Sequence, residues 1–444
     1  MEIVLLIDYG STYTKVVAAE TSHPKLLGSA SAYTTVETDV NEGLEIALRE
    51  LKKQTGISEY NKRFACSSAA GGLRMVVCGL VPELTAKAAS LASMGAGAKV
   101  VGKYSYELTE EDLEDITEKA PDILLLTGGT DGGNKKNILH NAEMLANAPG
   151  EYPIIVAGNR NSGREVEKIL AHRRVHLCEN VMPKIDALNI EPAKEKIREI
   201  FLERIVHAKG LSGSVLMPTP AAVLSATELL ATKTGDLIAI DVGGATTDIY
   251  SITDGTSKAA NIIYKGLPEP FAKRTVEGDI GMRYSARGII DAAGISRIAK
   301  LAEISEEKVS EHVSRLVKYT EKLPETKEEE KLDFALAAMA IETAMKRHAG
   351  SLEEVYTTSG RALIQTGKDL TDVKTIVMTG GVLLNTDRHN ELAAHALYND
   401  GEPQSLRPKK VKELVDKHYI LAAMGLLSTH SKTAALEIMR SNIL

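Results

Sequence analysis

The chain has 444 residues, too many for one ordinary hydrophobic core, so two to four domains are expected. Hydrophobic residues make up 43%, charged residues 25% and the formal net charge is −7, which is typical of a soluble, mildly acidic protein and argues against nucleic acid as a partner. The apolar runs are only long enough for strands, and the sequence enters a strand at once, so we expect a cytoplasmic protein with no membrane partner.

The first segment, residues 1–70, predicts two or three antiparallel strands, a helix near 43–53 and a strand at 63–66. From 71 to 183 the pattern changes to strands that alternate regularly with helices. Such alternation predicts a parallel, doubly wound sheet, which we interpret as an inserted α/β domain.

The first strand ends in Asp8, and a turn with Gly10, Ser11 and Thr12 follows. Glycine lets the backbone approach an anion closely, and N–H groups and hydroxyls can donate to phosphate oxygens. An aspartate at the end of the strand can face a hydrated Mg²⁺. The pattern therefore predicts a phosphate-binding hairpin, although an ordinary hairpin turn is the alternative.

A second glycine-rich turn, residues 127–133, follows a strand of the predicted insert. Glycine-rich turns at the carboxyl ends of strands commonly line ligand sites, and a loop that contacts a partner is the alternative. Further along, a helix near 193–207 is followed by a helix that starts with Pro218 and Pro220 in its first turn, where a missing N–H costs little.

The hairpin pattern then occurs a second time, after a strand that ends in Asp241. The residues of this second turn are Gly243, Gly244, Ala245, Thr246 and Thr247. Two matching hairpins suggest a duplicated fold in which both turns hold one polyphosphate. We expect a first half at 1–70 and 184–210, the insert at 71–183 and a second half at 211–444.

Several features follow the second hairpin. Residues 274–283 combine two basic and two acidic residues with two glycines, which suggests either a packed loop beside the nucleotide or a salt-bridged surface turn. Two helices broken near Pro324 are expected in 305–331, an alanine-rich helix at 332–347 and a closing amphipathic helix at 411–428. Between the last two, Gly380 and Gly381 end a strand, where glycine can admit a nucleoside against the backbone.

In their order and spacing, these motifs resemble those of the actin, sugar-kinase and heat-shock-chaperone ATPase superfamily. The turn after Asp8 resembles its phosphate-1 motif, the turn after Asp241 its phosphate-2 motif, and Gly380-Gly381 its adenosine motif. The resemblance implies an α/β fold with two ribonuclease-H-like halves around a nucleotide cleft. It also implies that Asp8 and Asp241 are the catalytic carboxylates and hold Mg²⁺ through water. The two turns would bind the phosphates of ATP or ADP, and the glycine pair would contact the adenosine.

More narrowly, residues 274–283, residues 127–133 and the length resemble the MutL/GlmL family, accessory proteins regarded as reactivating factors for adenosylcobalamin-dependent glutamate mutase and related aminomutases. This resemblance implies a chaperone-like, slow ATPase whose partner is such a mutase. The insert also resembles the cobalamin-binding domains of mutases without their cobalt-ligating histidine, so it would either dock on the partner or only support the cleft.

Two departures from the superfamily pattern affect catalysis. The region of the first connecting helix has Pro218-Thr219-Pro220 where the chaperone ATPases have a glutamate that places the attacking water, which leaves the general base open. Ala245 replaces a glycine, which suggests slow hydrolysis.

Three rival classes share the superfamily fold. A small-molecule kinase would need an acceptor motif, and an actin-like protein would form filaments. A dehydratase activator would hold an iron–sulfur cluster across a dimer, and Cys66, Cys78 and Cys178 lack the spacing for a metal site within one chain.

Overall fold

The computed structural model describes most of the chain, namely residues 2–34, 40–68, 73–209, 215–257, 262–357, 360–383 and 386–444. The contacts divide the chain into two compact units. The first consists of Met1–Gly71, Ala222–Tyr264 and Phe271–Leu444, and the second of Gly72–Ala221 and Lys265–Pro270. The three-part division expected from the sequence stays a prediction.

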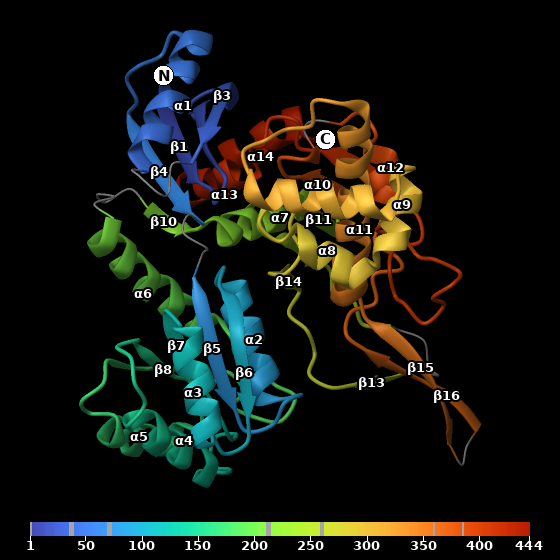
Figure 1. Cartoon of the computed structure of the whole chain (residues 1–444). Coiled ribbons are helices and arrows are strands. Elements are labelled where there is room, and N and C mark those ends of the chain that lie inside the picture. The colour runs from blue at the N-terminus through green and yellow to red at the C-terminus, as the bar shows by residue number, and fades with distance from the viewer. Residues whose placement is uncertain are drawn as a thin grey trace. The chain divides into compact units, whose positions relative to one another are not determined.

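The first sheet of unit 1 is built from the start of the chain (Figure 1). Its strands are β1 (Ile3–Tyr9), β2 (Tyr13–Glu20), β3 (Lys25–Tyr33) and β4 (Lys62–Ser67), and α1 (Val40–Thr55) lies between β3 and β4 in the chain. β1 pairs antiparallel with β2 and parallel with β4, and β2 pairs antiparallel with β3. Every residue of β1 is buried, as the apolar run at residues 3–7 predicts for all but its last two positions, Asp8 and Tyr9.

The second sheet of unit 1 repeats this arrangement. Its strands are β11 (Leu237–Val242), β12 (Thr247–Ile252), β14 (Ala272–Glu277), β17 (Thr375–Thr379) and β18 (Lys412–Val415). β11 pairs antiparallel with β12 and parallel with β17, and β12 pairs antiparallel with β14. The shared order and directions confirm the expected α/β fold with a duplicated half.

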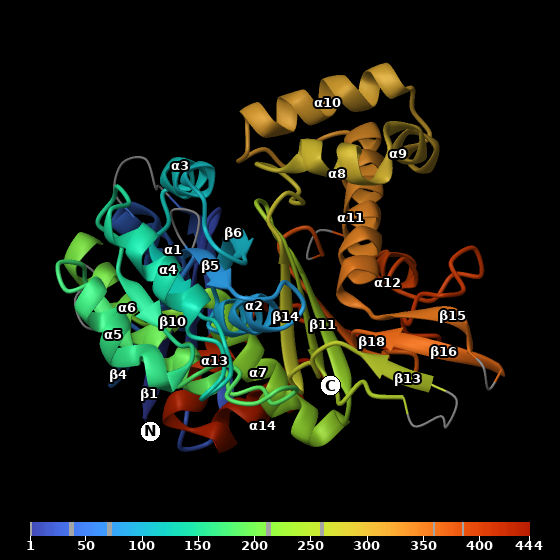
Figure 2. The same cartoon turned by 90° about the horizontal axis from the view of Figure 1, so that it is seen from below.

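The remaining helices of unit 1 pack on its two sheets and on one another. They are α7 (Thr219–Thr234), α8 (Ala286–Ala293), α9 (Ile295–Ala302), α10 (Glu306–Lys318), α11 (Lys327–His348), α12 (His389–Ala394), α13 (Leu421–His430) and α14 (Lys432–Asn442). The break between α10 and α11 confirms the one expected near Pro324. Figure 2 shows α8, α9 and α10 gathered at one end of α11. Alanine-rich α11 packs on Ile238 and Ile240 of β11 in one continuous core.

A small separate sheet extends from unit 1 (Figure 1). It consists of β13 (Ile262–Lys265), β15 (Ser351–Thr357) and β16 (Gly360–Thr366), in the order β13-β16-β15. β15 and β16 form an antiparallel hairpin.

Unit 2 contains a parallel sheet, as the alternation of strands and helices predicts. Its order is β6-β5-β7-β8-β9, with β5 (Arg74–Gly79), β6 (Lys99–Ser105), β7 (Ile123–Leu126), β8 (Ile154–Val156) and β9 (Val175–Leu177). The remaining elements are α2 (Thr85–Gly95), α3 (Glu110–Lys119), α4 (Lys136–Ala146), the 3-10 helix η2 (Arg160–Ser162), α5 (Gly163–Ile169), α6 (Glu191–Lys209) and β10 (Val215–Pro218).

The single closing helix expected at 411–428 is wrong. The segment begins as β18, which pairs parallel with β17, and a helix starts only at Leu421. Asp416 separates the two elements because its carboxylate accepts hydrogen bonds from the N–H groups of Ile420 and Leu421, at 2.8 and 3.0 Å. Tyr419 has φ = 52°, a left-handed conformation that a continuous helix does not contain.

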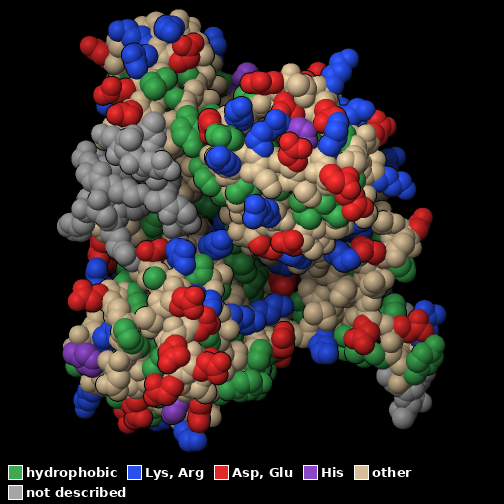
Figure 3. All heavy atoms as spheres, viewed as in Figure 1, with side chains coloured by type: hydrophobic (Ala, Val, Ile, Leu, Met, Phe, Trp, Pro, Cys, Tyr) green, Lys and Arg blue, Asp and Glu red, His purple; other side chains and the backbone are tan. Residues whose placement is uncertain are grey.

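Two further expectations concern the surface and the thiols. Acidic and basic side chains are intermingled on the face shown in Figure 3. In the described ranges, no helix combines the length and the apolar character needed to cross a membrane. Cys66 and Cys78 are buried, whereas Cys178 is only partly buried, and the thiol of Cys66 donates to Asp8 Oδ1 at 3.5 Å.

Candidate nucleotide site

The hairpin between β1 and β2 forms the first predicted phosphate loop. The N–H of Gly10 donates to the carbonyl of Tyr13 at 3.2 Å, and a Cβ atom at Gly10 would lie 2.5 Å from that oxygen, so the turn requires glycine. Asp8 is 4% exposed and Thr12 is 9% exposed. Thr12 Oγ1 is buried without a hydrogen-bond partner among the described residues.

The hairpin between β11 and β12 forms the second phosphate loop, and the same kind of backbone hydrogen bond closes it. The N–H of Gly243 donates to the carbonyl of Thr246 at 2.9 Å, so both turns close two residues after their aspartate. Two buried atoms of this hairpin, Asp241 Oδ1 and Thr247 Oγ1, also have no hydrogen-bond partner in the described part of the chain.

The structure brings the two loops and the predicted adenosine turn together within unit 1. A Cβ atom at Gly244 would lie 2.7 Å from Thr12 Oγ1, so the loops face each other at van der Waals distance. Gly380 has φ = 113°, and a Cβ atom there would lie 2.4 Å from the carbonyl oxygen of Val242 at the end of β11. Gly381 has open space on its Cβ side, which leaves room for a ligand against the backbone.

The charges at the two hairpins differ. Asp8 lies directly opposite Lys15 across β1 and β2, and Lys15 Nζ lies 3.0 Å from Asp8 Oδ2. Asp241 lies directly opposite Asp248 across β11 and β12. Like charges at opposite positions of a sheet are unfavourable. The first hairpin therefore pairs a carboxylate with an ammonium, whereas the second places two carboxyl groups opposite each other.

Burial and the neighbouring Asp248 raise the pKa of Asp241 to about 7. Lys15 opposes this shift, and Asp8 and Asp416 add to it. Because a pKa near 7 lies within the physiological range, Asp241 changes charge in response to small changes in its surroundings.

Asp248 is held by a buried arginine. Arg274 Nη2 of β14 lies 2.6 Å from Asp248 Oδ1, and Thr246 Oγ1 donates to Asp248 Oδ2 at 2.9 Å. Burial opposes the charge of Arg274, but Asp248 outweighs it and raises the pKa of the guanidinium. Arg274 and Thr246 therefore hold the Asp248 carboxylate in place, directly opposite Asp241.

Lys15 has a second contact, with the ring of Tyr419. Lys15 Nζ lies 3.5 Å from the ring centroid, a cation–π geometry. Burial disfavours the ammonium, but Asp8, Tyr419 and Asp241 together raise the pKa of Lys15. Tyr419 sits in its left-handed conformation between Asp416 and α13, and such strain at a non-glycine residue is typical of functional sites.

The loop at residues 278–283 packs against the second phosphate loop. The N–H groups of Met282 and Arg283 donate to the carbonyls of Gly243 and Gly244, at 3.0 and 2.8 Å. A Cβ atom at Gly281 would lie 2.3 Å from the carbonyl carbon of Ala245. Of the predicted segment 274–283, the part up to Glu277 therefore belongs to β14, and the remainder is a packed loop that holds the backbone of the second phosphate loop.

This bracing loop is itself anchored to α11. Arg283 is buried and donates to Asp333, with Nη2 2.8 Å from Oδ2. Near the other end of the loop, Arg347 Nη1 lies 3.2 Å from Asp279 Oδ1. Two salt bridges therefore connect the bracing loop with both ends of α11.

Sequence reasoning assigned no role to Lys15, Asp248 or Tyr419, although Asp248 ends the motif that resembles phosphate-2. Lys15 could have been found, because a two-stranded hairpin with its turn at 10–12 places residue 15 opposite residue 8. The equal spacing puts Asp248 opposite Asp241 in the second copy. Tyr419 carried no signal, because its position depends on the strand that replaced a predicted helix.

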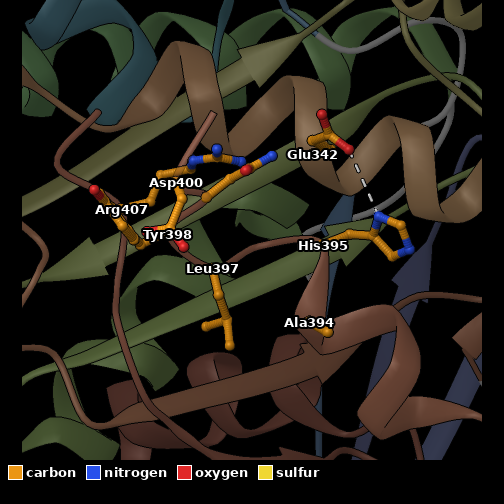
Figure 4. Close-up of a pocket in the computed structure, with 8 residues that line it drawn as sticks. Glu342, Ala394, His395, Leu397, Tyr398, Asp400 and Arg407 are labelled. Carbon is orange, nitrogen blue, oxygen red and sulfur yellow. Dashed lines mark ion pairs between the residues drawn. The ribbon is translucent and has the colours of Figure 1, made fainter. Parts of the chain in front are cut away.

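A cavity of about 320 Å³ lies elsewhere in unit 1 and contains none of the predicted site residues. Its lining consists of Glu342, Ala394, His395, Leu397, Tyr398, Asn399, Asp400 and Arg407 (Figure 4). His395 Nδ1 lies 3.6 Å from Glu342 Oε2. Hydrogen bonds from His395 and from Arg297 lower the pKa of Glu342 to about 2. Arg407 pairs with Glu402 at 3.0 Å. Since these charges are paired within the protein, the cavity is a weaker candidate for a ligand.

Comparison with known proteins places the whole chain in a family. A sequence model of the family described as MutL protein matches residues 4–443. Protein MutL of Clostridium tetanomorphum is 44% identical in an alignment of 456 positions that covers 99% of each chain.

Two solved structures are similar over nearly the whole chain at low identity. Component A of the (R)-2-hydroxyglutaryl-CoA dehydratase of Acidaminococcus fermentans is 11% identical, over 98% of this chain and 99% of that chain, with a TM-score of 0.33. A ligand-bound xylulose kinase from Lactobacillus acidophilus is 13% identical, over 100% of this chain and 92% of that chain, with a TM-score of 0.35.

Proposed function

The chain belongs to the MutL protein family, and from this premise we propose that it binds Mg-ATP at the two facing hairpins and acts on a partner enzyme. The partner we propose is an adenosylcobalamin-dependent mutase, either glutamate mutase or a related aminomutase. Slow ATP hydrolysis would accompany the release of damaged cobalamin from that enzyme. The family membership confirms the resemblance that suggested this role.

The observation that carries nucleotide binding is the set of three buried polar atoms without partners. Thr12 Oγ1 belongs to one loop, and Asp241 Oδ1 and Thr247 Oγ1 to the other. Leaving a buried polar atom unpaired costs about 1–3 kcal/mol, so unpaired buried atoms in both facing loops favour a polar ligand that pairs them. The facing loops fit a polyphosphate, which presents acceptors to hydroxyls and backbone N–H groups.

Three groups of residues would bind different parts of the nucleotide. Gly10, Ser11 and Thr12 would hold phosphate oxygens from one side, and the turn from Gly243 to Thr247 from the other. Gly380 and Gly381 would contact the adenosine.

Asp8 and Asp241 would hold Mg²⁺ through water, and the ion would supply charge neutralisation at the phosphates. In the described ranges, no group of three or more His, Cys, Asp and Glu side chains is arranged to hold a metal. Water and phosphate oxygens therefore fit as its remaining ligands.

Titration calorimetry of the full chain tests the site. We expect Asp241→Asn to weaken Mg-ATP binding by at least about tenfold, or about 1.4 kcal/mol, because the metal loses a carboxylate that holds it through water. The matched control is Asp372→Asn, since the side chain of Asp372 is fully exposed and lies outside the hairpins. Equal affinities for the parent and Asp241→Asn would refute the assignment.

A reactivation assay tests the partner. Inactivated glutamate mutase is incubated with fresh adenosylcobalamin and the full chain, with and without Mg-ATP. We expect mutase activity to return only with Mg-ATP, and Asp241→Asn to restore it far more slowly than Asp372→Asn. Nucleotide binding without any return of activity would overturn the partner while leaving the nucleotide site intact.

The burial of the cysteines bears on one rival class. Cys66 and Cys78 are both 0% exposed, so their sulfur atoms are not placed to hold an iron–sulfur cluster between two copies of the chain. This burial disfavours a dehydratase activator.

A further inference from the structure

The parallel sheet of unit 2 has a topological switch point between β5 and β7. β5 lies between β6 and β7 in the sheet, so the chain leaves β5 toward one edge and returns to add β7 on the other side. In open parallel sheets, ligands bind at the carboxyl ends of the two strands at such a point, because the loops there diverge. The loops in question begin at Leu80 after β5 and at Thr127 after β7.

A buried asparagine without partners lies at this switch point. Asn137, in the first turn of α4, is 4% exposed, yet its Oδ1 and Nδ2 atoms both lack a hydrogen-bond partner among the described residues. A Cβ atom at Gly128 would lie 3.2 Å from Asn137 Oδ1 and 3.9 Å from Leu80 Cβ. The amide therefore points at the place where the loops after β5 and β7 meet.

The next turn of the same helix provides a direct comparison. Asn141 is also buried, but its Oδ1 accepts from the N–H of Leu108 at 2.8 Å and its Nδ2 donates to the carbonyl of Tyr106 at 3.0 Å. Asn141 thus ties the loop after β6 to α4 and has a structural role. Asn137 has no such role, and an unpaired buried amide destabilises the folded chain. A residue kept at a cost to stability is typical of a binding site.

Two charged side chains near the switch point, Asp131 and Lys136, are already paired. Asp131 accepts from Asn180 Nδ2 at 3.0 Å and from the N–H of Arg160 at 3.1 Å. Lys136 Nζ lies 2.9 Å from Glu107 Oε1. A charged ligand would find no free counter-charge in these residues, whereas the amide of Asn137 offers one donor and one acceptor side by side.

We propose that unit 2 binds a neutral ligand bearing a carboxamide at the switch point between β5 and β7, and that Asn137 recognises it. The carboxamide N–H would donate to Asn137 Oδ1, and its carbonyl would accept from Asn137 Nδ2. Gly128 and Gly129 have φ values of 149° and 70°, which glycine adopts without strain, and Gly128 brings the turn after β7 close to Asn137 Oδ1. This site is separate from the nucleotide site of unit 1.

Thermal unfolding of the full chain tests whether Asn137 is kept for binding. Leucine has the same shape as asparagine without its polar atoms, so we expect Asn137→Leu to leave the Tm unchanged or raise it. Asn141→Leu, the matched control, should lower the Tm because the N–H of Leu108 and the carbonyl of Tyr106 lose their partners. A drop in Tm for Asn137→Leu as large as that for Asn141→Leu would overturn the proposal, since Asn137 would then be structural.

Ligand-observed NMR of the full chain tests the chemistry, with benzamide as the carboxamide probe and benzoate as its anionic counterpart of the same shape. We expect benzamide to bind the parent at least about tenfold more tightly than benzoate, because only benzamide can donate to Asn137 Oδ1. Asn137→Leu should abolish this preference and leave Mg-ATP affinity unchanged. No binding of benzamide, or equal binding by the parent and Asn137→Leu, would overturn the proposal whatever the outcome at the nucleotide site.

Discussion

The two hairpins share a backbone plan but differ in one charge. Seven residues after its aspartate, the first hairpin has a lysine and the second has another aspartate, and in both hairpins the two residues are direct cross-strand partners. Lys15 neutralises Asp8, whereas Asp248 raises the pKa of Asp241. The two copies of the hairpin therefore give their aspartates different surroundings, an ammonium group beside Asp8 and a second carboxyl group beside Asp241.

The raised pKa of Asp241 predicts how stability depends on pH in the absence of nucleotide. Between about pH 4 and pH 7 the folded chain keeps this proton more tightly than the unfolded chain, so the contribution of Asp241 becomes less favourable as the pH rises through this window. Asp241→Asn removes the penalty. We expect the variant to be about 2–4 kcal/mol more stable than the parent at pH 8 and nearly equal to it at pH 4, by urea denaturation.

Asp372→Asn is the control for this prediction, because its exposed carboxylate has no burial penalty to remove. The same stability difference between Asp241→Asn and the parent at pH 4 and pH 8 would show that the charge of Asp241 is not the cause.

At the scale of elements and their connections, the loop at residues 278–283 links the second phosphate loop to the helices. It connects β14 to α8, braces the second phosphate loop through backbone hydrogen bonds and reaches α11 through Arg283 and Asp333. A shift of the phosphate loop on nucleotide binding would therefore reach α11 through short, buried contacts. α11 in turn packs on α8 and α9 (Figure 2).

The close contact at Gly281 makes this bracing testable. We expect Gly281→Ala to weaken Mg-ATP binding at least about tenfold and to destabilise the chain by about 1–3 kcal/mol, because the new methyl group would overlap the backbone of Ala245. Calorimetry and urea denaturation measure the two effects.

Gly163→Ala is the matched control, since a Cβ atom there meets nothing within 4 Å and φ is −53°. We expect this control to bind Mg-ATP like the parent. Unchanged affinity in Gly281→Ala would show that the loop does not hold the phosphate loop in its binding form.

An element can be predicted from the sequence when the residues that determine it lie close together in the chain. The two hairpins were predictable because aspartate, glycine and hydroxyl residues specify a turn within a few positions. Residues 411–428 were not, because their helical periodicity is overridden by pairing of β18 with β17, a contact between distant parts of the chain.

The same reasoning applies to the candidate site. The bonds of Arg274 with Asp248 and of Arg283 with Asp333 depend on sheet register and helix packing, which the local sequence does not encode. The cluster at 274–283 could therefore be recognised as unusual, but its partners could not be named.

For the whole molecule, the two compact units are not consecutive pieces of chain. Unit 2 includes the short segment Lys265–Pro270, although β13 before it and β14 after it belong largely to unit 1. Leu267 of this segment is 0% exposed, and Glu269 forms an ion pair with Lys87 of α2 at 3.2 Å. The segment is thus part of the packing of unit 2.

A core substitution tests this role. We expect Leu267→Ala to destabilise unit 2 by about 2–5 kcal/mol and to speed hydrogen exchange of the amides in β5 and α2. Phe271→Ala is the control, because Phe271 is 57% exposed and lies just outside the segment. Exchange in β5 and α2 that is no faster in Leu267→Ala than in Phe271→Ala would show that unit 2 holds together without the segment.

Because Lys265–Pro270 is part of the packing of unit 2, it also limits which chimeras of this protein and its relatives could fold. A module encoded by one uninterrupted stretch of gene can be exchanged between relatives in a single crossover event. Transplanting residues 72–221 alone would leave behind the six-residue segment that completes their packing, so a viable chimera has to carry both stretches from the same parent.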